Sequence, residues 1–126
     1  MLDKPTATSA RQRDISKQDL RAWLAMLDEA GEIEHVAGAE REEEIGGIVD
    51  IYQRTPGSRA VLFDAVPGYP AGYRVIANIL TSVRRINLTL GLPADSSEMN
   101  LVQYWRQYMK QAKTIPPVEV KSGLLM

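Results

Sequence analysis

The chain has 126 residues, enough for one domain and too few for two of ordinary size. Its 15 basic and 16 acidic residues give a formal net charge of -1, so nucleic acid is not expected as a partner. Cysteine is absent, which excludes disulfides and thiolate chemistry. No apolar run approaches the roughly 20 residues that a membrane span needs, and no signal-peptide core precedes the domain, so we expect a cytoplasmic protein without membrane partners.

The first predicted helix follows a polar N-terminal arm over residues 1–15. Ser16 and Asp19 have the spacing of a capping box, and Gly31 is the expected end of the helix. Its apolar face repeats at helical spacing through Leu20, Trp23, Leu24 and Leu27. A short strand is expected around residues 33–36.

The second predicted helix begins near Glu42, where an acidic start suits the positive end of the helix dipole. Its apolar face contains Ile45, Ile48, Val49 and Tyr52. Gly46 and Gly47 lower helix stability, which predicts close backbone packing at that point. Two strands are then expected, a buried one over Ala60–Ala65 and another over Tyr73–Leu80.

Two further helices and a final strand are predicted in the last third of the chain. Thr81 or Ser82 is expected to cap the third helix, which Gly91 closes. Asp95 and Glu98 have capping-box spacing at the start of the fourth. The apolar stripe of that fourth helix is the widest in the chain, and it contains Leu101, Tyr104, Trp105, Tyr108 and Met109. We expect this stripe to pack in the core, with an interface as the second interpretation.

The order of these elements predicts an α+β fold, a small mixed sheet packed with about four helices. The folded domain is expected over residues 16–115. After Pro116 and Pro117, Val118 and Val120 alternate with charged residues as in an edge strand, so residues 116–126 are expected to form an edge strand and an apolar tail that docks on a partner.

No catalytic, cofactor-binding or metal-binding residue is predicted. His35 is the only histidine and has no ligand pattern beside it, so a surface or strand histidine is expected. Consecutive carboxylates over Glu40–Glu44 point in different directions on a helix, and the helix N-terminus explains them better than a cation does. Arg84 and Arg85 are interpreted first as a solvated helix face and second as an ion pair across an interface.

An ordered series of segments resembles one family over about residues 16–123. The segments are DLRAWLAMLDEAGEIEHV from Asp19, EEEIGGIVDIYQRTPGSRAVLFDAVPGYP, YRVIANILTSVRRINLTLGL and PPVEVKSG. The series is similar to the N-terminal domain of the UbiD-type decarboxylases, which include 3-polyprenyl-4-hydroxybenzoate carboxy-lyases and ferulic acid decarboxylases. One departure is Thr81, where the family commonly has glycine.

The resemblance implies a role in the reversible decarboxylation of aromatic or α,β-unsaturated acids. That chemistry uses prenylated FMN with a divalent metal (Mn or Mg) and K in some members, in a domain that follows the stretch similar to PPVEVKSG. No residue of this chain corresponds to that site. The resemblance therefore implies a non-catalytic small subunit, or N-terminal domain, that works with a larger catalytic subunit in a hetero-oligomer.

Contact with that larger subunit is expected through the C-terminal residues and the paired arginines, because an edge strand can add to the sheet of a partner. The expected interface residues are Val118, Val120, Leu124, Leu125, Met126, Arg84 and Arg85. Three alternatives stay open: a stand-alone binding or regulatory module without a flavin partner, an independent small enzyme, and a piece of a longer decarboxylase.

Overall fold

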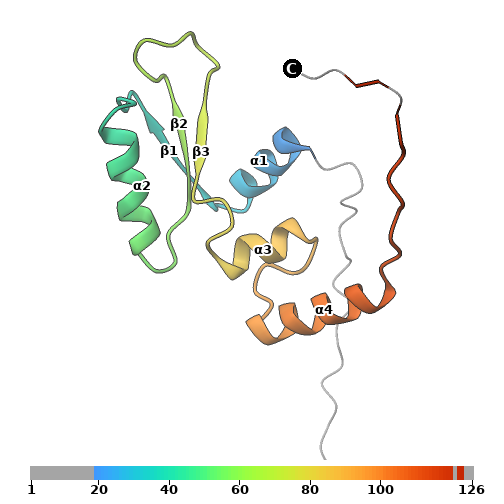
Figure 1. The fold of residues 1–126 in the computed structure, drawn as a ribbon. Helices are drawn as coiled ribbons and strands as arrows, with labels where there is room; N and C mark the ends of the chain where they lie inside the picture. The colour runs from blue at the N-terminus through green and yellow to red at the C-terminus, as the bar shows by residue number, and fades with distance from the viewer. Residues whose placement is uncertain (1–18, 121, 124–126) are drawn as a thin grey trace, which may run out of the picture.

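A computed structural model describes residues 19–120 and 122–123 of the chain (Figure 1). Four helices and three strands follow one another in the described part. In chain order they are α1 (Leu20–Glu29), β1 (Ile33–Ala37), α2 (Glu44–Arg54), β2 (Ala60–Asp64), β3 (Val75–Ala77), α3 (Val83–Thr89) and α4 (Glu98–Gln111).

The three strands form one mixed sheet in the order β1-β2-β3. β1 and β2 are parallel, with Ile33 opposite Ala60, and α2 connects them as a crossover helix. β2 and β3 are antiparallel, with Leu62 opposite Ile76. The predicted α+β class with a small mixed sheet and about four helices is therefore confirmed.

The central strand β2 is buried on both faces because its side chains alternate between two apolar clusters. Leu62 points toward the cluster that contains Trp23 and Leu27 of α1. Phe63 points toward the other cluster, in which Val66 is buried and α2 supplies a partly buried face. The sheet thus lies between α2 on one side and α1 with α3 on the other (Figure 1).

Capping side chains set the starts of three helices, and two of these caps differ from the predicted residues. The backbone N–H of Ala22 donates to Asp19 at 2.7 Å, so Asp19 is the N-cap of α1, while Ser16 lies outside the described residues. Ser82 caps α3, as one of the two predicted choices. Ser97 caps α4 in place of the predicted Asp95, since its hydroxyl accepts from the N–H of Asn100.

The prediction of close backbone packing at the two α2 glycines is wrong. A Cβ built at Gly46 or Gly47 meets no atom within 4 Å among the described residues, and both positions are exposed. The apolar face of α2 packs on the sheet through Ile45, Ile48 and Val49 instead. The glycines therefore weaken the helix without any compensating contact inside the described part of the chain.

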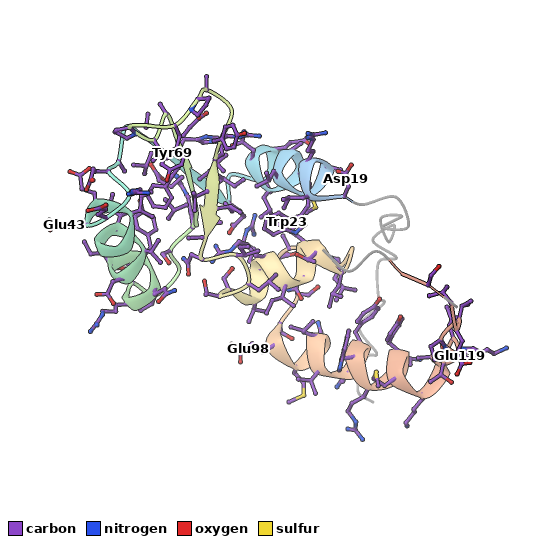
Figure 2. All side chains as sticks on the ribbon, turned by 45° about the horizontal axis from the view of Figure 1, so that its top comes forward. Asp19, Trp23, Glu43, Tyr69, Glu98 and Glu119 are labelled. Atoms are coloured by element: carbon purple, nitrogen blue, oxygen red, sulfur yellow. The ribbon has the colours of Figure 1, made fainter. Side chains whose placement is uncertain are left out.

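Trp23 joins α1 to α3 across the first cluster. Its side chain lies between the two helices (Figure 2), where the indole Nε1–H donates to the hydroxyl of Thr89 at 2.9 Å. That hydroxyl donates in turn to the backbone carbonyl of Arg85 at 2.7 Å. The polar end of a buried tryptophan is thus satisfied by the neighbouring helix.

A buried arginine on α3 connects four separate segments of the domain. The Arg85 side chain is 1% exposed and forms an ion pair with Glu32, just before β1, at 3.2 Å. Its guanidinium also donates to the carbonyl of Ser58 at 2.8 Å and its Nε–H to the carbonyl of Ile79 at 3.1 Å. The hydroxyl of Thr81 accepts a further hydrogen bond at 2.8 Å. All the turns that lead into and out of the sheet at this end therefore meet at one side chain.

Asn78, directly after β3, extends this polar network. Its backbone has a positive φ of 59°, a conformation that asparagine tolerates better than most residues. Its amide donates to the hydroxyl of Ser58 and to the carbonyl of Arg59, at 3.0 and 2.8 Å. The Thr81 hydroxyl donates to the Asn78 Oδ1 at 2.6 Å, which gives the threonine at this position a structural role that glycine lacks.

Removing the charge of Glu32 is expected to destabilise the domain strongly. In Glu32→Gln the guanidinium of Arg85 stays buried without its counter-charge, and the expected loss is about 3 kcal/mol of unfolding free energy, measured by urea denaturation. Glu34→Gln is the matched control, because the ion pair of Glu34 with Arg59 at 3.0 Å is exposed and contributes only about 0–1 kcal/mol. Equal losses in the two variants would contradict the structural role of the buried pair.

Replacing an α2 glycine by alanine is expected to stabilise the domain. Gly47→Ala relieves the entropic penalty of glycine in a helix without a clash, so a gain of about 1 kcal/mol is expected in thermal or urea unfolding. Gly57→Ala is the opposing control, since Gly57 has a φ of +73° and an alanine there is strained by about 1–2 kcal/mol. A destabilised Gly47→Ala domain would mean that another part of the chain approaches α2 closely.

Candidate partner-binding surface

The apolar stripe of α4 is exposed, so the expectation that it packs in the core is wrong for the described part of the chain. No residue of α4 is buried, and Trp105 is 49% exposed. Its ring stacks on that of Tyr108, with centroids 5.6 Å apart, and Tyr108 stacks on Tyr104. The pattern predicted an apolar face correctly, but α3 covers only part of it. The second interpretation, an interface, fits this exposure.

A groove runs between α3 and α4, and exposed apolar side chains, among them Val102 and Trp105, line it. Its cavity volume is about 450 Å³. Its walls are Leu80, Ile86, Thr89, Leu90, Leu101, Val102, Trp105 and Arg106. We call this feature the α3–α4 groove.

The C-terminal run is extended and exposed. Residues 112–120 form neither helix nor strand, and Val118 is 85% exposed. No described strand pairs with this run, so the expected edge strand is not part of the sheet formed by β1, β2 and β3. Leu124, Leu125 and Met126 lie outside the described residues. Docking of this run on a partner therefore stays a prediction.

The two arginines expected at the interface point into the domain itself. Arg85 is buried in the network described above, so the interpretation of a solvated helix face is wrong for it. Arg84 is half exposed, and its Nε–H donates to the same carboxylate, that of Glu32, at 2.6 Å. Both carboxylate oxygens of Glu32 thus have a guanidinium partner, and only Arg84 retains surface for an external contact.

In the described part of the chain, no group of three or more His, Cys, Asp or Glu side chains lies close enough to hold a metal ion. His35 is exposed on β1 and contacts Asp28 at 2.9 Å. Within the acidic run, Glu42 pairs with Arg41, while Glu44 accepts from the backbone N–H of Glu40 at 2.8 Å. The carboxylates thus serve separate local contacts.

One contact between distant residues could not be predicted from spacing. Arg41 donates to the hydroxyl of Tyr69 at 2.7 Å and lies 5.9 Å from the centre of its ring. Hydrogen bonds to Tyr69 and then to Glu42 raise the pKa of the Arg41 guanidinium above its ordinary value. Tyr69 lies in the loop after β2 (Figure 2), and Arg41 lies just before α2. The contact therefore connects this loop to the segment that leads into α2. We assign it a structural role.

Among the described helices, none is long and apolar enough to cross a bilayer. The candidate binding surface in the described part is the α3–α4 groove, together with the exposed run that follows α4.

Comparison with solved structures gives matches in fold that include two structures of one decarboxylase. Vanillic acid decarboxylase from Sedimentibacter hydroxybenzoicus (ShVdcCD), in open form with truncated ShVdcD, matches 79% of this chain with 26% identity and a TM-score of 0.68. The same decarboxylase in open form matches 76% of the chain with 26% identity and a TM-score of 0.65. The match covers 21% and 20% of those chains, so this chain spans about a fifth of their length.

No curated protein sequence matches the chain. The model of the 3-octaprenyl-4-hydroxybenzoate carboxy-lyase N-terminal domain matches residues 24–105, which run from α1 into α4 and make up more than half of the sequence. The chain therefore belongs to the family of 3-octaprenyl-4-hydroxybenzoate carboxy-lyase N-terminal domains, the UbiD-type N-terminal domains.

Proposed function

We propose that this chain is a non-catalytic small subunit, or N-terminal domain, of a UbiD-type decarboxylase acting on an aromatic or unsaturated carboxylic acid. The observation that carries the proposal is that the chain has the family's N-terminal domain and spans only about a fifth of its solved relatives. In this proposal the larger part of such an enzyme lies on a partner subunit or, for an N-terminal domain, in the remainder of a longer chain. The relative's name, vanillic acid decarboxylase, supports an aromatic acid as the substrate class.

The cofactor belongs, in this proposal, to the larger subunit. Prenylated FMN would supply the electron sink for loss of carbon dioxide, with Mn or Mg, and K in some members of the family, bound beside it. The described residues of this chain do not fit such a group, because they present no cluster of three metal-ligating side chains. We therefore assign this chain a role in assembly and in shaping the substrate entrance. A cytoplasmic location is a separate part of the proposal.

The proposed division of the chain has three parts. Residues 1–15 form an arm, residues 16–115 the folded domain, and residues 116–126 a docking segment. Val118 and Val120 are 85% and 72% exposed, which supports the last assignment. An extended segment with exposed apolar side chains and no pairing strand among the described residues is suited to strand addition.

Isolation of the native complex tests the proposal. The tagged chain is purified from its own cells and studied by native mass spectrometry and absorbance spectroscopy. We expect it to co-purify with a larger UbiD-type subunit, and we expect the complex to have a flavin-like absorbance spectrum. The complex should release carbon dioxide from aromatic acids, and the separated small chain should not. A colourless chain without such a partner would overturn the proposal in favour of a stand-alone binding module, and turnover by the small chain alone would favour an independent enzyme.

The docking segment is tested within that complex by a double substitution. Val118→Asp with Val120→Asp places two charges where apolar side chains are proposed to pack, so the affinity for the larger subunit is expected to fall at least about tenfold, equal to 1.4 kcal/mol, in a titration of purified subunits. Glu119→Gln, between the two positions, is the control and should change affinity little. Unchanged affinity of the double variant would remove the docking role of this run.

A further inference from the structure

The apolar face of α4 is only partly covered in the described part of the chain. The helix has 14 residues, none of them buried, and it lies on the side of α3 away from the sheet (Figure 1). Helices of about this length are marginal in water alone, and most of their stability in proteins comes from packing of an amphipathic face. Something beyond the described residues is therefore expected to cover α4.

The residues that line the α3–α4 groove indicate which kind of side chains would bind in it. Seven of its eight wall residues are apolar or contribute a methyl group, and the other is Arg106. After Glu98, the only charged residues of α4 are Arg106 and Lys110. Arg106 forms no ion pair with another described residue. An occupant with aliphatic side chains flanked by a carboxylate would match both features.

We infer that the α3–α4 groove receives an apolar segment, with acidic residues beside it, of the larger subunit, and that α4 is held in place by this contact. The inference rests on the proposed function and adds the location of the main interface. Trp105 forms the centre of the contact, since it stands in the groove wall and stacks on Tyr108 at 5.6 Å. Large aromatic side chains in such positions commonly dominate binding energy.

The length of the relatives favours the larger subunit as the occupant. The family match ends at residue 105, inside α4, and about four-fifths of each solved relative lies outside the region that this chain matches. Because the family is an N-terminal domain, that remainder follows the domain in the chain. α4 is the last helix before it and continues into the exposed run proposed to dock, so the two surfaces are contiguous along the chain.

Two other occupants fit the groove less well. Residues 1–18 are polar and contain four basic and two acidic residues, so they bring little apolar surface and the same charge sign as Arg106. A second copy of this chain, related by a two-fold axis, would bring the same face, with its Arg106 and Lys110 side chains, against itself. Residues 1–18 have an excess of basic over acidic residues, and so does α4, so both occupants match the charge of Arg106 less well than an acidic segment does.

Tryptophan fluorescence provides a direct test, because the two tryptophans differ in exposure. Trp23 is buried and Trp105 is half exposed, so acrylamide should quench Trp105 preferentially in the separated chain. In the native complex with the larger subunit, quenching of Trp105 is expected to fall by a factor of at least about three, taking a fully covered ring as the bound state. Hydrogen exchange of residues 98–111 is expected to slow at least about tenfold, because the helix is then packed.

A charge-matched pair of variants locates the contact. Val102→Asp puts a carboxylate in the groove wall, and Gln103→Asp puts the same group on the polar side of α4. Val102 is 52% exposed, so both chains should fold, as circular dichroism and urea unfolding of the separate chains would establish. The Val102→Asp chain is expected to bind the purified larger subunit at least about tenfold more weakly, with Gln103→Asp close to the unsubstituted chain.

The outcomes separate this inference from the proposed function. A flavin-bearing complex in which Trp105 stays quenchable and Val102→Asp binds normally would overturn the inference and leave the small-subunit role intact. If self-association of the chain shields Trp105, the second copy is the occupant. If deletion of residues 1–18 removes the shielding of Trp105, those residues are the occupant. Either result would overturn the inference. A chain that captures no larger subunit would overturn the inference together with the proposed function.

Discussion

The ion pair between Glu32 and Arg85 is the constraint on which the described domain depends. It joins the start of β1 to α3, and the same guanidinium holds the turn before β2 and the turn after β3. A buried charge without its partner is unfavourable by several kcal/mol, so these four segments can meet in only one arrangement. The neighbouring Asn78 and Thr81 complete the hydrogen bonding, which fixes where α3 begins relative to the sheet. Shape here is determined by satisfaction of polar groups as much as by apolar burial.

Local patterns predicted the helices and strands because each depends on residues close in sequence. The 3.6-residue spacing around Trp23 and Leu27 identified α1, and the apolar run through Leu62 identified β2. Burial of Arg85 could not be predicted, since its partners are 27 and 53 residues away and no spacing connects them. Likewise, the sequence shows that α2 has no side chain at Gly46 and Gly47, but it does not show whether another part of the chain packs against these positions.

The candidate surface was predicted only in part. The stripe on α4 indicated an apolar face, yet a sequence pattern does not reveal whether that face meets the same chain or another one. The described part of the chain has one layer beyond the sheet on that side, α1 with α3, and α4 stands outside it (Figure 1). The aromatic residues Trp105 and Tyr108 were identified correctly as large apolar area with polar ends, and their interface interpretation came second because core packing is more common.

The structure separates the groups that stabilise the domain from those available for assembly. Among the described residues, the buried ones lie in the two clusters around β2, in the polar network of Arg85 and Asn78, and at Asn87 and Gly91 near the end of α3, while the apolar residues of α4 and of the run through Val118 are half-buried or exposed. We expect substitutions in the first set to act on unfolding free energy and those in the second to act on the proposed association, and their effects should be nearly additive because the two sets are distant and share no partner. On the proposed function, the fold can then be kept while the proposed partner changes. Selection for a particular larger subunit would therefore act on α4, and selection for folding on Glu32 and Arg85.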